Sequence, residues 1–446
     1  MSAAPLTVRT EAEDALLIAF DAAGKNLPGD KWIARQRAAA MDRFRHTGLP
    51  TRRVEEWKYT DLRALLRVAA PLASDLKSAA TAAPGNDPLS GLDRAVLVIL
   101  NGAFDKTMSD LDGLKGVKVT PIADALAKGD RRIGTLIEDN PDTALALNTA
   151  FMAGGALIEV AEGAQPVRPI EIMHVVTETQ PASVYVRNVV SVGKGASVRI
   201  VESYRGPAGV AYQTNVVNEL ALHEGAHAIW AKLQVDGDKA LHIGTLATRI
   251  ESNVEFDHLT ITAGAAATRS QIYVEIAGEG ARTSLNGTNL LSGNQHVDLM
   301  LSIDHTAPDA KTRVLYKNIA RDKATGAFQG KINVHQLAQK TDAKMMNRTL
   351  LLSDEASFAA KPELEIWADD VTCGHGSTSG RIDDDMLFYF LSRGIPRAEA
   401  ERLLIIAFLS EAIEAIGDPA LIAALEPLVE ERLAAIPVSE LNARLA

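Results

Sequence analysis

The chain has 446 residues, of which 47% are hydrophobic and 23% are charged, and its formal net charge is −11. This length predicts two or three domains, and the acidic balance argues against binding to nucleic acid or to an anionic membrane surface. No apolar run approaches the ~18 residues of a membrane span, and the first residues lack the apolar segment of a secretory signal. The single cysteine, Cys373, excludes an internal disulfide, so a reducing, cytoplasmic compartment is expected.

Residues 1–145 are predicted to form an N-terminal, mostly helical domain. Two helical segments open it, residues 10–24 and residues 30–48, each ending at a glycine. Residues 94–102 are apolar and β-branched, which predicts a strand inside this region. Residues 79–91 are rich in small side chains and are expected to form a linker within this region.

From residue 146 to residue 382, short alternating strands replace the helical periodicity. Turns recur at nearly even spacing, at Gly163, Gly195, Gly225, Ser252 and Gly280. A period of this size, about 30 residues, indicates stacked units that close their core only by stacking. We therefore predict a mainly β core domain with the architecture of a β-solenoid; a β-sandwich with long strands stays as the alternative.

Residues 223–227, HEGAH, match the His-Glu-x-x-His signature of zinc hydrolases. That chemistry needs a helix, which brings both histidines onto one face. Here the motif contains the recurring turn at Gly225, and four extended residues span ~13 Å, too far for His223 and His227 to share one ion. We therefore predict solvent-exposed turn histidines. The strand that follows has alternating apolar residues on one face, namely Ile229, Ala231, Leu233 and Val235.

Helical periodicity returns in residues 383–446, the predicted C-terminal domain. Gly394 ends one helix, a second spans residues 396–416, and Asp418 caps a third that has Pro419 at its first turn. Two interpretations stay open at this point. The helices cap an open end of the solenoid against edge pairing, or they form a docking surface for a partner.

The segment VTCGHG contains Cys373 and, two positions later, His375. Residues two apart on a strand face the same side, and a thiolate with an imidazole suits iron or zinc. Gly374 and Gly376 leave room for close approach. Iron or a cluster generally takes about four ligands, so the others would come from a second chain. The alternative is a buried free cysteine beside a polar turn. No nucleotide loop or hydrolase triad stands out, so we do not expect an enzyme.

Several segments resemble the SufB/SufD family of iron–sulfur cluster assembly scaffolds. They are residues 48–65, 148–151 and 330–395, and the block KPELEIWADDVTCGHG is the most specific. The resemblance implies a central right-handed parallel β-helix flanked by N-terminal and C-terminal α-helical domains. The resemblance is closer to the SufD type than to the SufB type, because SufB-type subunits use an additional cysteine inside the β-helix and this chain has only Cys373. Gly374 replaces the usual Ser and GSTSG replaces the usual GATVG, but neither change removes a ligand atom.

The resemblance also implies partners and a site. The chain would pair with a SufB-like subunit and bind the ATPase SufC, and Cys373 and His375 would hold iron or a nascent iron–sulfur cluster transiently at the shared interface. No cofactor is expected to bind tightly to the chain alone. SufC would dock on the C-terminal helices, where Arg393, Gly394 and Phe408 are the candidate contact residues. A homodimer through the same edge is an alternative assembly, and a secreted-type β-helix enzyme acting on polysaccharide is the competing function.

Overall fold

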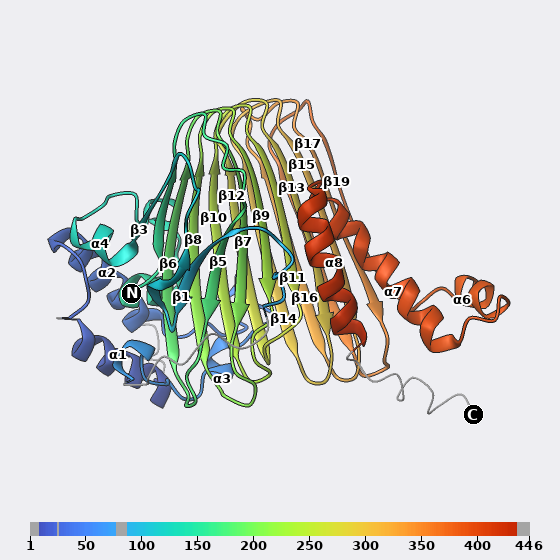
Figure 1. Cartoon of the computed structure of the whole chain (residues 1–446), viewed down its shortest axis with the longest axis horizontal. Coiled ribbons are helices and arrows are strands. Elements are labelled where there is room, and N and C mark those ends of the chain that lie inside the picture. The colour runs from blue at the N-terminus through green and yellow to red at the C-terminus, as the bar shows by residue number, and fades with distance from the viewer. Residues whose placement is uncertain (1–8, 25, 77–86, 435–446) are drawn as a thin grey trace, which may run out of the picture.

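The computed structural model describes residues 9–24, 26–76 and 87–434. Its centre is a parallel β-solenoid built from a ten-stranded and a nine-stranded sheet (Figure 1). One group of helices lies beside the first turns and a second group lies near the last turns, so the predicted mainly β fold with flanking helices is confirmed. The β-sandwich alternative is wrong. No helix in these ranges is both long and apolar enough to span a membrane.

From β4 onward, the strands alternate between the two sheets along the chain. The ten-stranded sheet contains, in spatial order, β2 (Ala103–Asp110), β1 (Ala95–Leu100), β5 (Ile170–Val175), β7 (Ser197–Arg205), β9 (His227–Gln234), β11 (Glu255–Thr262), β13 (Arg282–Leu291), β15 (Lys311–Ala320), β17 (Asp342–Leu351) and β19 (Thr372–Gly380). The nine-stranded sheet contains β3 (Val117–Pro121), β4 (Ala156–Val160), β6 (Ser183–Val192), β8 (Gln213–Leu222), β10 (Leu241–Ile250), β12 (Ala267–Ile276), β14 (His296–His305), β16 (Thr325–Val334) and β18 (Ser357–Ile366). Among the described strands, β2 and β3 pair antiparallel with their neighbours and the other pairs are parallel.

The register of the strands explains the repeat seen in the sequence. Leu241 pairs with Gln213 on one side and with Ala267 on the other, so each strand pairs with the strands one repeat before and one repeat after it. The predicted turn glycines have φ values of 67°, 63°, 67° and 73°, a region that disfavours residues with a Cβ; they are Gly163, Gly195, Gly225 and Gly280. The predicted stacking and the turn positions are therefore confirmed.

Alternate residues of every strand point into the solenoid and form one long core. Its members are mainly β-branched and aliphatic, with a few aromatic side chains such as Trp230, Phe256 and Phe328. Burial of one such side chain contributes about 1.5–3 kcal/mol to the stability of the fold. A single turn cannot bury its own apolar face, so the core forms only when the turns stack. The inward face of the last turn, on β18 and β19, lies at the open end of this core.

The N-terminal helices cover one side of the solenoid, most of them beside the first turns, although residues 55–60 reach along the nine-stranded sheet as far as β18, where Glu55 pairs with Lys361. They are α1 (Glu11–Ala23), α2 (Lys31–Thr47), α3 (Leu62–Leu65), α4 (Ile122–Ala127) and α5 (Thr143–Phe151), with short 3-10 helices η1 (Glu55–Trp57), η2 (Ala73–Asp75) and η3 (Thr135–Ile137). The two predicted helices and the strand at 94–102 are confirmed as α1, α2 and β1. Because β1, β2 and β3 belong to the sheets, the β structure starts before residue 146. The domain limits stay predictions, and most of the predicted linker lies outside the described residues.

The C-terminal helices are α6 (Asp384–Leu391), α7 (Arg397–Glu414) and α8 (Pro419–Ala434). Helices α7 and α8 cover the outer face of the ten-stranded sheet, where Leu409 and Leu425 join a cluster with Ile229 and Leu233. The predicted apolar face of β9 is thus confirmed, and its cover is this pair of helices. Capping of the open end is the wrong interpretation for α7 and α8, because they lie on a face of the sheet and leave β18 and β19 as its edges.

Candidate functional site

Cys373 and His375 lie on β19, the last strand of the ten-stranded sheet. Cys373 pairs with Ala343 and His375 pairs with Met345, and both partners belong to the inward core. Side chains in register on neighbouring strands point to the same face. The two candidate ligands therefore share one face of the strand, as predicted, and this is the inward face at the open end of the solenoid. Cys373 is half-buried against the core and His375 is exposed.

The backbone of β19 presents an open edge at these same residues. The Thr372 N–H donates to the Thr341 carbonyl of the preceding turn at 2.9 Å. In a parallel strand successive residues direct their N–H and C=O groups to opposite sides. The backbone groups of Cys373, His375 and Ser377 thus point away from β17. Within the described residues no strand pairs with this side, and such an edge is a template for a further strand.

The edge of β18 differs from that of β19. The Ser357 N–H donates to the Ala324 carbonyl just before β16 at 3.1 Å, and the Trp367 N–H donates to the carbonyl of Val334, the last residue of β16, at 2.8 Å. The even-numbered residues of β18 therefore face the open side. One of them is Pro362, which has no N–H. The Lys361 ammonium pairs with Glu55 of η1 and with Glu363, the latter at 3.0 Å. Strand β18 is therefore a charged edge with an interrupted row of donors, whereas β19 offers a continuous row.

The chemistry at Cys373 depends on groups beyond this chain. Burial raises the pKa of the Cys373 thiol, and the Asp342 carboxylate raises it further, so the isolated chain favours the neutral thiol. Among the residues that the structure describes, no group of three His, Cys, Asp or Glu side chains could hold a metal ion. A metal bound by Cys373 and His375 therefore needs further ligands from elsewhere.

The two glycines beside the pair have different surroundings. A Cβ on Gly374 would meet no atom of the described residues within 4 Å, whereas a Cβ on Gly376 would lie 2.7 Å from the Met346 methyl carbon. A side chain at position 376 would thus displace the flexible end of Met346, whereas Gly374 leaves open space on the outer face of β19.

The HEGAH histidines do not share a metal site. The segment makes a turn and then enters β9, and His223 and His227 each leave 43% of the side chain exposed. His223 Nδ1 lies 3.1 Å from Glu251, and His227 Nε2 lies 3.6 Å from Asp257. The two rings thus have separate carboxylate neighbours. Both are partly exposed rather than fully solvated, and His227 is the first residue of β9 rather than part of the turn.

The three candidate partner contacts lie in two places. The Arg393 guanidinium lies 3.4 Å from the centre of the Tyr389 ring, just after α6, and Gly394 follows it with φ 79°. Phe408 is half-buried on α7, with the Lys317 ammonium 4.5 Å from its ring centre. Phe408 therefore helps to hold α7 on the sheet, whereas Arg393 and Gly394 are exposed.

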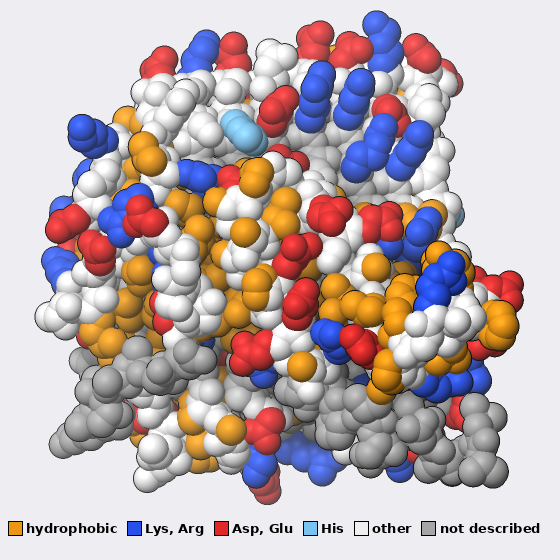
Figure 2. Space-filling view, turned by 45° about the vertical axis from the view of Figure 1, so that its right-hand side comes forward, with side chains coloured by type: hydrophobic (Ala, Val, Ile, Leu, Met, Phe, Trp, Pro, Cys, Tyr) orange, Lys and Arg blue, Asp and Glu red, His pale blue; other side chains and the backbone are white. Residues whose placement is uncertain are grey.

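Sequence reasoning missed the exposed apolar surface of α6. Four of its large side chains are exposed by 37% to 71%, namely Met386, Phe388, Tyr389 and Leu391, whereas Leu387 is buried. Figure 2 shows hydrophobic side chains gathered on the face that carries the C-terminal helices, with Lys and Arg side chains grouped above them. Contiguous exposed apolar side chains mark interaction surfaces. The signal in the sequence was the run MLFYFL, too short and too apolar for a solvated helix.

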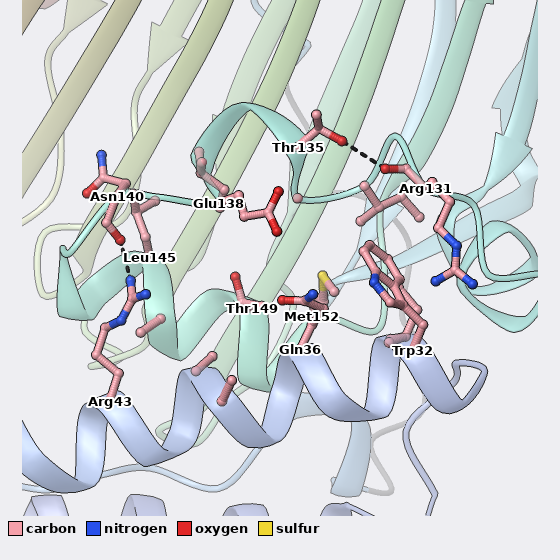
Figure 3. Close-up of a pocket in the computed structure, with 17 residues that line it drawn as sticks. Trp32, Gln36, Arg43, Arg131, Thr135, Glu138, Asn140, Leu145, Thr149 and Met152 are labelled. Atoms are coloured by element: carbon pink, nitrogen blue, oxygen red, sulfur yellow. Dashed lines mark hydrogen bonds between the residues drawn. The ribbon is translucent and has the colours of Figure 1, made fainter.

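A small cavity lies away from the open end, between α2, α5 and η3. Its volume is about 100 Å³, and it is lined by apolar side chains together with Arg43, Arg131 and Thr149. Figure 3 shows the Arg43 guanidinium bonded to the Asn140 carbonyl and the Thr135 hydroxyl bonded to the Arg131 carbonyl at the rim. No predicted site residue lies in it.

Comparison with known proteins agrees with this architecture. Residues 174–408 match the SUF system FeS cluster assembly, SufBD core domain, and residues 26–172 match the SufBD protein N-terminal region. An iron–sulfur cluster assembly SufBD family protein of Synechocystis is 31% identical over 87% of this chain and 88% of its own length. The iron–sulfur cluster assembly protein SufD of Escherichia coli is 29% identical over 85% of this chain and 88% of its own. Protein ABCI7, chloroplastic, of Arabidopsis thaliana is 29% identical over 86% and 82%. The chain therefore belongs to the SufB/SufD family of iron–sulfur cluster assembly proteins.

Proposed function

We propose that this chain is a non-catalytic scaffold subunit that pairs with a SufB-like subunit through its open end and contributes Cys373 and His375 to an iron or nascent-cluster site shared by the two chains. The observation that carries the proposal is the position of this pair. Both side chains lie on the inward face of an edge strand whose backbone is open at the same residues. A partner strand added at this edge brings its own side chains next to them.

The donor set suits iron. A thiolate and a neutral imidazole are ligands that iron accepts in clusters, and one chain supplies two of about four positions. Because the pKa of Cys373 is raised, binding of the metal displaces the thiol proton. The chain alone thus holds iron poorly, and the paired chains hold it well. This behaviour fits a site where a cluster is assembled and then passed on.

The second partner in this proposal is the ATPase SufC, docked on the C-terminal helices. The exposed apolar side chains of α6, including Phe388 and Tyr389, supply the surface, and Arg393 adds a cation stacked on Tyr389. Aromatic and Arg side chains are enriched among the residues that dominate binding energy. Since α7 is fixed to the sheet, movement of the ATPase on α6 and α7 is transmitted to the solenoid.

The test uses the complex with both partners, purified without oxygen. His375→Ala should leave assembly intact and lower the bound iron and acid-labile sulfide severalfold, because it removes a ligand from an exposed position. His46→Ala, on the exposed surface of α2, is the matched control. Normal iron and sulfide content in His375→Ala would contradict the proposal, as would polysaccharide cleavage by the purified chain.

A further inference from the structure

A row of asparagine side chains runs inside the solenoid toward the open end. Asn289 Nδ2 donates to Asn318 Oδ1 at 2.7 Å, and Asn318 Nδ2 donates to Asn347 Oδ1 at 2.9 Å. The three residues lie on β13, β15 and β17, and all are buried. Along the row, each amide oxygen accepts from the preceding strand and each NH2 group points to the following one. The aligned dipoles direct their positive end at β19.

The last amide of this row has an unused donor. Asn347 is fully buried, and its Nδ2 has no hydrogen-bond acceptor among the described residues. Its Oδ1 faces β15, where Asn318 lies, so the Nδ2 points away from β15 and toward β19. Most buried donors in folded proteins have a partner, and an unsatisfied one is costly. The geometry calls for an acceptor at the open end.

The position of this donor relates it to the candidate ligands. Asn347 pairs in register with Ser377, and the neighbouring inward residue Met345 pairs with His375. Neighbouring strands lie about 4.8 Å apart, so an amide on the inward face of β17 borders the space in front of β19. That space is where His375 and Cys373 point. His375 lies one inward position from Ser377 along β19, so an acceptor bound beside His375 lies on the same inward face as the Asn347 amide.

We propose that Asn347 donates a hydrogen bond to an anionic sulfur of the nascent cluster, a sulfide bound to the iron that Cys373, His375 and the partner chain ligate. This inference rests on the proposed function. Hydrogen bonds to cluster sulfurs are a main means by which proteins stabilise clusters. The aligned amides of the row strengthen the donor, because each hydrogen bond polarises the next. The role is to bind sulfide, not to ligate iron.

Two substitutions separate this role from a structural one. Asn347→Asp keeps the oxygen that accepts from Asn318 and removes the donor, so it breaks no hydrogen bond within the described chain. Asn289→Asp makes the same chemical change in the same row, but it also removes a donor that Asn318 uses. Both variants bury a carboxyl group, so that cost is common to them. We expect Asn289→Asp to be the less stable variant and to keep sulfide, and Asn347→Asp to be the more stable one and to lose sulfide.

The experiment uses the whole complex under anaerobic conditions, loaded with ferrous iron and sodium sulfide and then desalted. Asn347→Asp should retain sulfide roughly ten-fold more weakly, the effect of losing one hydrogen bond to a charged group. Binding of ferrous iron alone should be unchanged, since Asn347 is not an iron ligand. General damage to the site would lower both. Asn347→Leu is the uncharged second variant, and there Asn318 keeps acceptors at Thr349 and Arg348.

Each outcome has a distinct meaning. Wild-type retention of sulfide by both Asn347 variants overturns the inference, and so does loss of ferrous iron binding in proportion to sulfide. Failure of Asn347→Asp to assemble with the SufB-like subunit also overturns it, because the acceptor would then belong to the partner. If His375→Ala loses iron while Asn347→Asp keeps sulfide, only the role of Asn347 fails. If His375→Ala keeps both, the proposed function itself fails.

Discussion

At the scale of single residues, the N-terminal motif 48–65 has a structural role. Trp57 is buried, its Nε1 donates to Asp142 at 2.7 Å, and the Arg269 guanidinium lies 4.6 Å from its ring centre. The Thr60 hydroxyl donates to Asp298 at 2.6 Å. These contacts fix the N-terminal segment on the outer face of the nine-stranded sheet. A motif that looks functional in the sequence is here an anchor.

This anchor gives the first stability prediction. Trp57→Ala removes a buried aromatic ring and leaves Arg269 without its stacking partner, so the free energy of unfolding should fall by about 3–5 kcal/mol. Lys58→Ala, at an exposed position beside it, should change it by less than about 0.5 kcal/mol. Urea unfolding followed by circular dichroism measures both. Equal stability of the two variants would show that the motif does not anchor the segment.

Sequence reasoning found the candidate ligands at this scale because they are two apart on one strand. It missed the asparagine row, although Asn289, Asn318 and Asn347 follow one another at equal intervals close to the repeat period. The reason is physical. Only the register of β13, β15 and β17 shows that the three amides meet, and a spacing alone does not say which face a side chain takes.

At the scale of elements, the two open edges, β18 and β19, differ in the residues that they carry. Strand β19 has the sequence TCGHGSTSG, without an acidic residue, a lysine, an arginine or a proline. Natural edge strands usually carry such residues to prevent pairing with other chains. Here they are lacking on β19 and present on β18, as Lys361, Pro362 and Glu363. The pairing surface is therefore concentrated on the strand that holds the candidate ligands.

Ser377→Pro tests this edge. The substitution removes an N–H that points outward and leaves the donors toward β17 in place. Binding to the SufB-like subunit should weaken by about ten-fold, because a strand partner loses one hydrogen bond and meets the proline ring. Ser377→Ala keeps the N–H and should bind as the wild type does. Calorimetric titration compares the two, and equal binding would exclude β19 as the paired edge.

The positions of the C-terminal helices were beyond sequence reasoning for a different reason. The pattern in α7 and α8 shows that they have apolar faces, but it does not name the surface that those faces cover. The outward residues Ile229, Ala231 and Leu233 of β9 indicate that this outer face is covered, because an apolar face is normally buried, but they do not identify the element that covers it. The solenoid itself was predictable, because turn glycines with positive φ recur with the period of its units.

At the scale of the whole molecule, the solenoid encloses ionisable groups that its stability depends on. Burial lowers the pKa of His174 to about 4, of His258 to about 3 and of His305 to about 4. The Lys232 ammonium lowers the pKa of His258 further. Inside the folded chain these rings stay neutral down to pH values at which an unfolded chain has already protonated them.

The pH dependence of stability follows. As the pH falls below about 6.5, the unfolded state binds protons that the folded state does not bind, so stability decreases. Each of the three histidines should cost up to about 2 kcal/mol at pH 5. Urea midpoints at pH 8, 6.5 and 5 measure the effect, and His258→Leu should reduce the slope. A midpoint that stays constant from pH 7 to pH 5 would contradict the burial of these rings.

The two ends of the solenoid are unequal, and this limits how far it can polymerise. At the first turns the sheets end in β2 and β3, which run antiparallel; the pairing of β2 has an irregular register near Val96 and Val98, and β3 is short and ends at Pro121. At the last turns the sheets end in parallel strands with an open β19 edge. Solenoids with a pairing edge at both ends would form filaments, whereas a solenoid with a pairing edge at one end can bind only one partner in this way. In the proposed assembly, two solenoids joined at their open ends would leave only ends without an open parallel edge outside, so growth would stop at the pair.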